Sequence, residues 1–133
     1  MKKELDVVAA LIIKDDKFLV CQREENDSYG LLWEFPGGCI ELNETFQEAI
    51  EREIKEELDL EIKAVSLIKT FFDENENLKI KIFLWSCKIN QGIPKTKQCN
   101  AFGFFNIKEI SFLRLAPADN KIYNYLKSVF KKK

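Results

Sequence analysis

Residues 37–60 read GGCIELNETFQEAIEREIKEELDL and hold seven glutamates with a single arginine. Thr45, followed three residues later by Glu48, forms a capping box, and neither glycine nor proline interrupts the chain from there to Leu58. These features predict a helix of about four turns. One apolar arc of this helix is expected to pack on the rest of the protein, and its members are Phe46, Ala49, Ile50, Ile54 and Leu58.

Three of the glutamates lie on or beside this packing side of the helix. At helical spacing Glu53 and Glu57 point into the apolar arc, and Glu56 lies at its edge. A buried carboxylate is costly unless a positive charge compensates it, and like charges three or four residues apart repel each other. Ion pairs with neighbours such as Arg52 and Lys55 would supply that charge, as would a divalent ion. Carboxylate oxygens suit Mg²⁺ or Mn²⁺ better than zinc.

The composition predicts one globular domain, residues 1–133. Of the 133 residues, 46% are hydrophobic and 32% are charged, which is enough apolar material for one core. The net charge of −1 gives no general attraction to a nucleic acid polymer or an anionic membrane. We expect any polyanionic ligand to be held by a local site.

The absence of histidine excludes Ser-His-Asp and Cys-His sites and His-ligated zinc. Proton transfer is then left to carboxylates, lysines or metal-bound water. The four cysteines have no CxxC spacing and no signal peptide precedes them, so we expect reduced thiols in a cytoplasmic protein. The apolar run at residues 7–13 is too short to cross a bilayer.

Strand-forming runs alternate with turn signals along the rest of the chain. They predict strands at residues 5–13, 18–22, 33–35, 61–72, 78–89 and 102–105. Pro36-Gly37-Gly38 is expected to break any regular element before the acidic helix. Pro117 opens a closing helix to about residue 130, whose inner face would be Ile122, Leu126 and Val129 or Phe130. The order of elements predicts an α/β (α+β) class with helices on two faces of a mixed sheet.

The acidic segment has a spacing that can be written from Gly38. Five residues separate it from Glu44, and seven more precede the run Arg52-Glu53-Ile54-Lys55-Glu56-Glu57-Leu58-Asp59-Leu60. This pattern resembles the Nudix box and matches its fixed positions except at Asp59, where the family has glycine. That position follows the helix and needs a left-handed conformation, which aspartate tolerates less well than glycine. We expect a small stability cost and an intact site.

The resemblance extends beyond the box. Residues 33–38, WEFPGG, and the following Ile40-Glu41 look like the same region of MutT-type members, as do residues 21–23 and 115–119. The resemblance implies a Nudix α/β/α sandwich with a mixed β-sheet between helices. It also implies hydrolysis of a nucleoside triphosphate to a monophosphate and pyrophosphate, with 8-oxo-dGTP or a cytidine-type nucleotide as the substrate.

The resemblance also assigns roles to residues. The implied ligands of Mg²⁺ (or Mn²⁺) are the Gly37 carbonyl, Glu53, Glu56 and Glu57. Glu53 is the implied general base, Glu44 a supporting carboxylate, and Arg52 the residue that orients the carboxylates.

Substrate contacts are expected from Arg23, Phe35 and Asp119. Asp119 lies where MutT-type enzymes read the base, although an acidic residue at a helix start also complements the helix dipole. Phe35, like Trp33 and Phe72, could stack on the base or pack in the core.

Two positions depart from the pattern of many relatives. Gln98 replaces a loop glutamate, and Cys39 replaces a lysine after the paired glycines. These departures keep a second hypothesis open, namely a nucleotide sensor with a Nudix fold that binds without hydrolysis. The oligomeric state is expected to be a monomer or a homodimer.

Overall fold

The two aspartates between the first strands form a tight hairpin turn. In the computed structural model, which describes residues 2–130, β1 (Lys3–Lys14) and β2 (Lys17–Gln22) pair antiparallel. Asp15 and Asp16 both have positive φ, 53° and 63°, and two such residues match the right-handed twist of the flanking strands. The predicted hairpin is confirmed.

The strands of the described chain form one mixed sheet. Its remaining members are β3 (Trp33–Glu34), β4 (Gly37–Cys39), β5 (Glu61–Glu74), β6 (Leu78–Gln91) and β7 (Ala101–Phe105). The strand order is β3-β2-β1-β6-β5, with β4 paired to β1 and β7 paired to β2. β1 runs parallel to β6 over residues 3–12, whereas the other pairs are antiparallel.

Two local predictions need correction. Gly37 and Gly38 do not end regular structure, because β4 pairs with β1 through Val7, Val8 and Ala9. A Cβ atom on Gly37 would lie 1.9 Å from the Val8 carbonyl oxygen, so glycine permits this close pairing. The short helix α2 (Ile107–Ile110) was also not predicted, because a single turn gives no periodic pattern.

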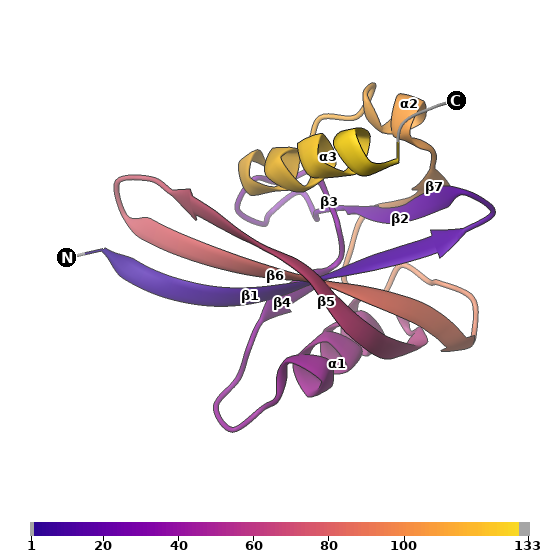
Figure 1. The fold of residues 1–133 in the computed structure, drawn as a ribbon, viewed down its shortest axis with the longest axis horizontal. Coiled ribbons are helices and arrows are strands. Elements are labelled where there is room, and N and C mark those ends of the chain that lie inside the picture. The colour runs from indigo at the N-terminus through magenta and orange to yellow at the C-terminus, as the bar shows by residue number, and fades with distance from the viewer. Residues whose placement is uncertain (1, 131–133) are drawn as a thin grey trace.

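Helices cover both faces of the sheet (Figure 1). Helix α1 (Phe46–Leu58) packs on the face that carries Val8 and Ala10, and α3 (Pro117–Val129) packs on the opposite face of β1. The expected α/β/α sandwich with a mixed sheet is confirmed. On α3, Ile122 and Leu126 are buried as predicted, but neither Val129 nor Phe130 is, since they are 52% and 42% exposed. No helix within residues 2–130 combines the length and apolar character that a membrane crossing requires.

Both ends of α1 follow the sequence signals. Thr45 accepts the Glu48 N–H, and the Glu48 side chain accepts the Thr45 N–H, which completes the capping box. Asp59 follows the helix in the left-handed region, with φ 52° and ψ 41°. The predicted conformation of Asp59 is confirmed.

Asp59→Gly is expected to raise the free energy of unfolding by about 1 kcal/mol, because glycine relieves the left-handed strain. The carboxylate is within 3.0 Å of Lys55 and 3.7 Å of Lys95, but such exposed ion pairs contribute little. Chemical denaturation measures the change. Asp59→Ala is the matched control, since it removes the same ion pairs and keeps Cβ. If the glycine variant were no more stable than the alanine variant, strain at this position would be negligible.

Candidate active site

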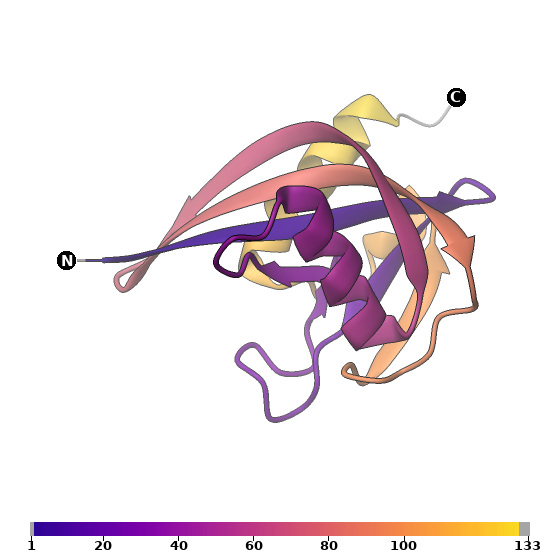
Figure 2. The ribbon, with the colours of Figure 1, turned by 90° about the horizontal axis from the view of Figure 1, so that it is seen from below.

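A cleft of about 570 Å³ opens between α1, the start of α3 and the loop before β7. Its lining includes Gly37, Gly38, Glu53, Glu57 and Asp119. The segments between β2 and β3 and between β6 and β7 lie at the same side of the molecule, beside the carboxyl-terminal end of α1 (Figure 2). The fold therefore brings together most of the side chains that the sequence singled out.

The Arg52 guanidinium lies at the centre of the acidic cluster. Its Nε and Nη2 donate to the two carboxylate oxygens of Glu44, at 2.5 and 3.0 Å. Nη1 donates to Glu53 at 3.0 Å and to Glu56 at 3.2 Å, and Nη2 also donates to the Cys39 carbonyl at 3.1 Å. The two parallel bonds to Glu44 fix the guanidinium plane. Arg52 is thus positioned to orient Glu53, while the catalytic roles of Arg52 and Glu44 stay predictions.

Glu53 and Glu57 form a close carboxyl pair. The two groups lie within hydrogen-bonding reach of each other. Burial, with the nearby Glu34 and Glu53 carboxylates, raises the pKa of Glu57 to about 10. Burial also raises the pKa of Glu53, against the opposing hydrogen bond from Arg52. Oε1 of Glu57 is buried without a hydrogen-bond partner among the described residues, so this pair needs a shared proton or a cation.

The Gly37 carbonyl points away from β1. The Ala10 N–H donates to the Pro36 carbonyl at 2.8 Å, and the Ile40 N–H donates to the Asp6 carbonyl at 3.1 Å. Hydrogen-bonded and non-hydrogen-bonded pairs alternate along an antiparallel ladder, so Gly37 lies at a non-hydrogen-bonded position. Its carbonyl oxygen is therefore available to a ligand.

The oxygen atoms that could bind a divalent ion form only part of a coordination site in this conformation. Glu53, Glu57 and the Gly37 carbonyl offer oxygens, and the unpartnered Glu57 oxygen marks where positive charge is needed. The Glu56 side chain is 47% exposed and turned to Arg52. Within residues 2–130 no three acidic or cysteine side chains already converge as a metal site. Glu56 would have to turn inward to complete the set.

Arg23 lies in the cleft, but its hydrogen bonds are to the protein. Nη1 donates to Glu34 at 2.7 Å, and Nε and Nη2 donate to the carbonyl and hydroxyl of Ser28 at 2.6 and 3.3 Å. Arg23 therefore holds the segment between β2 and β3 against the sheet. A contact between Arg23 and the substrate stays a prediction.

Glu34 is a cleft residue that the sequence reasoning missed. Burial raises its pKa, against the charge and hydrogen bond of Arg23. The sequence signal for Glu34 is its place between Trp33 and Phe35. Successive side chains in an extended segment point to opposite sides, so Glu34 points away from the side on which its two aromatic neighbours pack.

Asp119 lies in the first turn of α3 and lines the cleft. Its Oδ1 accepts the Phe35 N–H at 2.9 Å. Burial and the charge of Glu34 raise the pKa of Asp119 well above its ordinary value, against that hydrogen bond. A backbone bridge between Trp33 and Leu115 joins β3 to the segment before α3 and so fixes this position. This position is compatible with both roles considered for Asp119, namely stabilising the start of α3 and contacting the base of a nucleotide.

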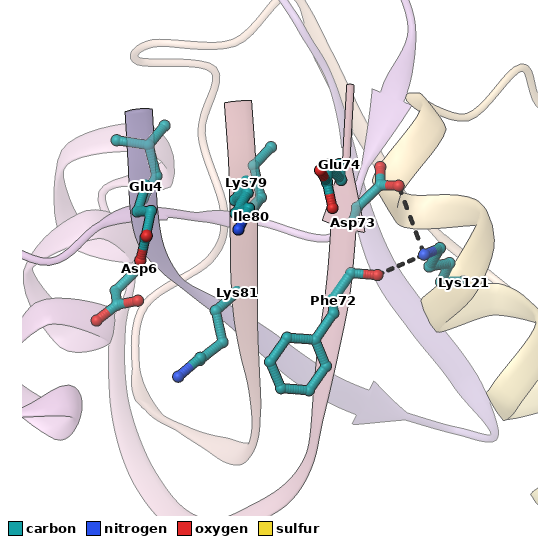
Figure 3. Close-up of a pocket in the computed structure, with 10 residues that line it drawn as sticks. Glu4, Asp6, Phe72, Asp73, Glu74, Lys79, Ile80, Lys81 and Lys121 are labelled. Carbon is teal, nitrogen blue, oxygen red and sulfur yellow. Dashed lines mark hydrogen bonds and ion pairs between the residues drawn. The ribbon is translucent and has the colours of Figure 1, made fainter. Parts of the chain in front are cut away.

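The three aromatic candidates for stacking lie in different surroundings. The Phe35 ring is only 3% exposed and packs in the core under α3, so core packing is its observed role and contact with a base stays a prediction. Trp33 packs edge-on against Phe105. Phe72 is 63% exposed but lies outside the cleft, in a hollow of about 690 Å³ where Lys81 Nζ is 5.7 Å from its ring centroid (Figure 3).

The two departures from the family pattern also lie at the site. Gln98 lines the cleft, and its backbone N–H donates to the Glu57 carbonyl at 3.1 Å. Cys39 is exposed on β4, and it is its carbonyl rather than its thiol that contacts Arg52.

Known proteins resemble the chain over almost its whole length. The chain is 32% identical to the CTP pyrophosphohydrolase of Escherichia coli (strain K12), over 88% of this chain and 87% of that protein. It is 31% identical to the 8-oxo-dGTP diphosphatase of Proteus vulgaris, over 74% of this chain and 90% of that protein. The solution structure of the E. coli ORF135 protein matches with a TM-score of 0.80 and 28% identity, covering 99% of this chain and 96% of that chain.

A MutT protein from methicillin-resistant Staphylococcus aureus 252 gives a TM-score of 0.74 at 34% identity, covering 97% of this chain and 99% of that chain. The model of the NUDIX domain family matches residues 3–126. With the acidic helix, the sandwich fold and these relatives in agreement, the chain belongs to the Nudix hydrolase family and is a MutT-type member of it.

Proposed function

We propose that this chain, acting as one domain in a monomer or a homodimer, hydrolyses a nucleoside triphosphate to a monophosphate and pyrophosphate with Mg²⁺ or Mn²⁺. The observation that carries the proposal is the Glu53–Glu57 pair, two adjoining carboxyls with one unpartnered buried oxygen in a cleft. Such a pair is stabilised by a divalent ion, and divalent ions are what diphosphate chemistry requires. Membership of the Nudix hydrolases supports the same reaction class.

The residues around the Glu53–Glu57 pair would have different roles in the proposed hydrolysis. A bound ion would neutralise phosphate charge and lower the pKa of the attacking water. Glu53 would accept the proton of that water, and its raised pKa makes it a stronger base than an ordinary carboxylate. Arg52 would hold Glu53 in orientation, and Glu44 would hold Arg52. Glu56 would turn from Arg52 toward the ion.

Asp119 favours a substrate whose nucleobase offers both a hydrogen-bond donor and a hydrogen-bond acceptor. The raised pKa of Asp119 favours its protonated form, and a protonated carboxyl both donates and accepts hydrogen bonds. The amino group and N3 of cytosine form such a pair, and so do N7–H and its neighbouring oxygen in 8-oxoguanine. A CTP pyrophosphohydrolase and an 8-oxo-dGTP diphosphatase are both among the relatives. We propose 8-oxo-dGTP or a cytidine-type nucleotide as the substrate.

Pyrophosphate release from a panel of triphosphates tests the proposal. The panel contains 8-oxo-dGTP, dGTP, CTP, 5-methyl-dCTP and ATP, each with Mg²⁺, with Mn²⁺ and with a chelator. We expect metal-dependent release that is fastest on 8-oxo-dGTP or a cytidine-type nucleotide. Monophosphate must appear in equal amount, because release of inorganic phosphate alone would mean attack at a different phosphorus.

The alternative is a sensor that binds nucleotides without hydrolysis. It is favoured by Gln98, which cannot act as a base, and by the lack of three converging acidic ligands in the described chain. Binding of a panel nucleotide by calorimetry, without turnover under any metal condition, would establish the sensor and reject the hydrolase.

Asp119→Asn is expected to change the ranking of bases by about 10-fold or more, while the fold and the Phe35 contact persist. The asparagine oxygen still accepts the Phe35 N–H, but its amide always donates at the other position and cannot release a proton. Values of kcat/KM across the panel measure the change. Asn120→Ala, an exposed neighbour on the same turn, is the control. A uniform loss across all bases would argue against base reading by Asp119.

A further inference from the structure

Two thiols from distant segments meet beside the cleft. Cys21 lies in β2 and is 0% exposed, whereas Cys99 precedes β7 and is 8% exposed. Their side chains are hydrogen-bonded to each other. All four cysteines of the chain are free, and the other two are the exposed Cys39 and the buried Cys87.

The backbone around both thiols is held by the sheet. Gln22 pairs with Ala101 in the antiparallel ladder between β2 and β7. Beyond this pair the Asn100 N–H donates to the Gln22 carbonyl at 2.9 Å, and the Asn100 amide donates to the Gln22 side chain at 2.5 Å. Cys21 and Cys99 also belong to the same cluster of buried residues, so their side chains already lie in the same part of the core, as a disulfide bond requires. Little conformational entropy is lost in bringing them together.

The two thiols differ in access. Cys99 lines the cleft and can meet a small molecule that enters it, whereas Cys21 is sealed in the core. The hydrogen bond from Cys21 lowers the pKa of Cys99, and the same bond together with burial raises the pKa of Cys21. A thiol on the wall of a cleft, beside a second thiol with no exposed surface, is the arrangement of a redox-sensitive pair.

We propose that Cys21 and Cys99 form a reversible disulfide when the protein meets a peroxide. In the first step the Cys99 sulfur attacks the peroxide, the O–O bond breaks, and Cys99 sulfenic acid and water form. In the second step the Cys21 sulfur attacks the Cys99 sulfur, the S–O bond breaks, and the hydroxyl leaves as water with the Cys21 proton. Two thiols are oxidised by two electrons, and one peroxide is reduced to two waters.

The bond would also affect the carboxylate pair. The N–H groups of Lys97 and Gln98 both donate to the Glu57 carbonyl at 3.1 Å, and the Lys95 N–H donates to the Leu58 carbonyl at 2.8 Å. Drawing Cys99 toward β2 would therefore pull on the end of α1 that carries Glu57. This consequence rests on the proposed hydrolysis, for which we expect the oxidised form to be slower by on the order of 10-fold or more.

Oxidation of the chain by hydrogen peroxide tests the disulfide without reference to activity. The treated protein is alkylated, digested and mapped by mass spectrometry. We expect a linked pair of peptides containing Cys21 and Cys99, a mass lower by two hydrogens, and full reversal by dithiothreitol. The Cys39→Ser variant removes the exposed competing thiol and should give the same link. Free Cys21 and Cys99 after treatment that oxidises Cys39 in the unmodified chain would overturn the proposal.

Two variants test the order of the two steps and distinguish the specific disulfide from general oxidation of the cysteines. In Cys21→Ala, Cys99 should stop at the sulfenic acid and be trapped by dimedone, while Cys87→Ala, which removes the other buried thiol, should still form the link. No dimedone adduct in the first variant would overturn the order. Equal hydrolysis rates before and after oxidation would overturn the effect on the cleft. A chain that forms the link but never hydrolyses any nucleotide would instead reject the proposed function.

Discussion

Glu53→Gln is expected to lower kcat for nucleoside triphosphate hydrolysis by about 10²–10⁴-fold, the range for loss of a general base. Glutamine keeps the size of the side chain and still accepts the Arg52 N–H, but it cannot take a proton from water. The change also removes one of two adjoining carboxyls whose burial is costly. We therefore expect the free energy of unfolding without metal to stay the same or rise, as measured by thermal and chemical denaturation.

Glu48→Gln is the matched control for this variant. It makes the same change of charge on the same helix, on the solvent side, and glutamine still accepts the Thr45 N–H that completes the capping box. Its kcat should equal that of the unmodified chain. Near-normal turnover in Glu53→Gln, with Glu48→Gln as reference, would remove Glu53 from the mechanism.

Much of the fold and the acidic part of the site could be predicted because their signals are local. The helical period alone placed Glu53 and Glu57 on the packing side of α1, and their close approach follows from that spacing. The capping box fixed the start of the helix, and the Asp15-Asp16 pair fixed the first turn. Each of these features depends on residues within about one turn of chain.

The parts that were missed depend on contacts between distant segments. Glu34 is half-buried because the Trp33–Leu115 bridge places the segment before α3 beside it. This burial is not encoded in spacing along one helix. Glu56, by contrast, pairs with Arg52 four residues before it on α1, and its role as a metal ligand stays a prediction. The strand β4 likewise exists only because Gly37 can approach β1 closely.

Glu57→Gln is expected to stabilise the metal-free protein by on the order of 2 kcal/mol at pH 8. Between the ordinary pKa of 4.5 and the folded value of about 10, the folded chain holds a proton on Glu57 and the unfolded chain does not. The unfolded state then binds fewer protons, so the stability of the unmodified chain falls as pH rises through this window. Glutamine needs no proton, and this part of the pH dependence should disappear.

Melting temperatures at pH 6 and pH 9, with and without Mg²⁺, measure the pH dependence of stability and the stabilisation by the metal. In the unmodified chain Mg²⁺ should compensate the ionised Glu57 and raise the melting temperature more at pH 9 than at pH 6. In Glu57→Gln the gain from Mg²⁺ should be largely lost, although the metal-free variant is more stable. Glu61→Gln makes the same change at an exposed position and should leave both responses unaltered. A Glu57→Gln variant that keeps the full Mg²⁺ response would mean that Glu57 is a buried acid of the core and not a ligand of the metal.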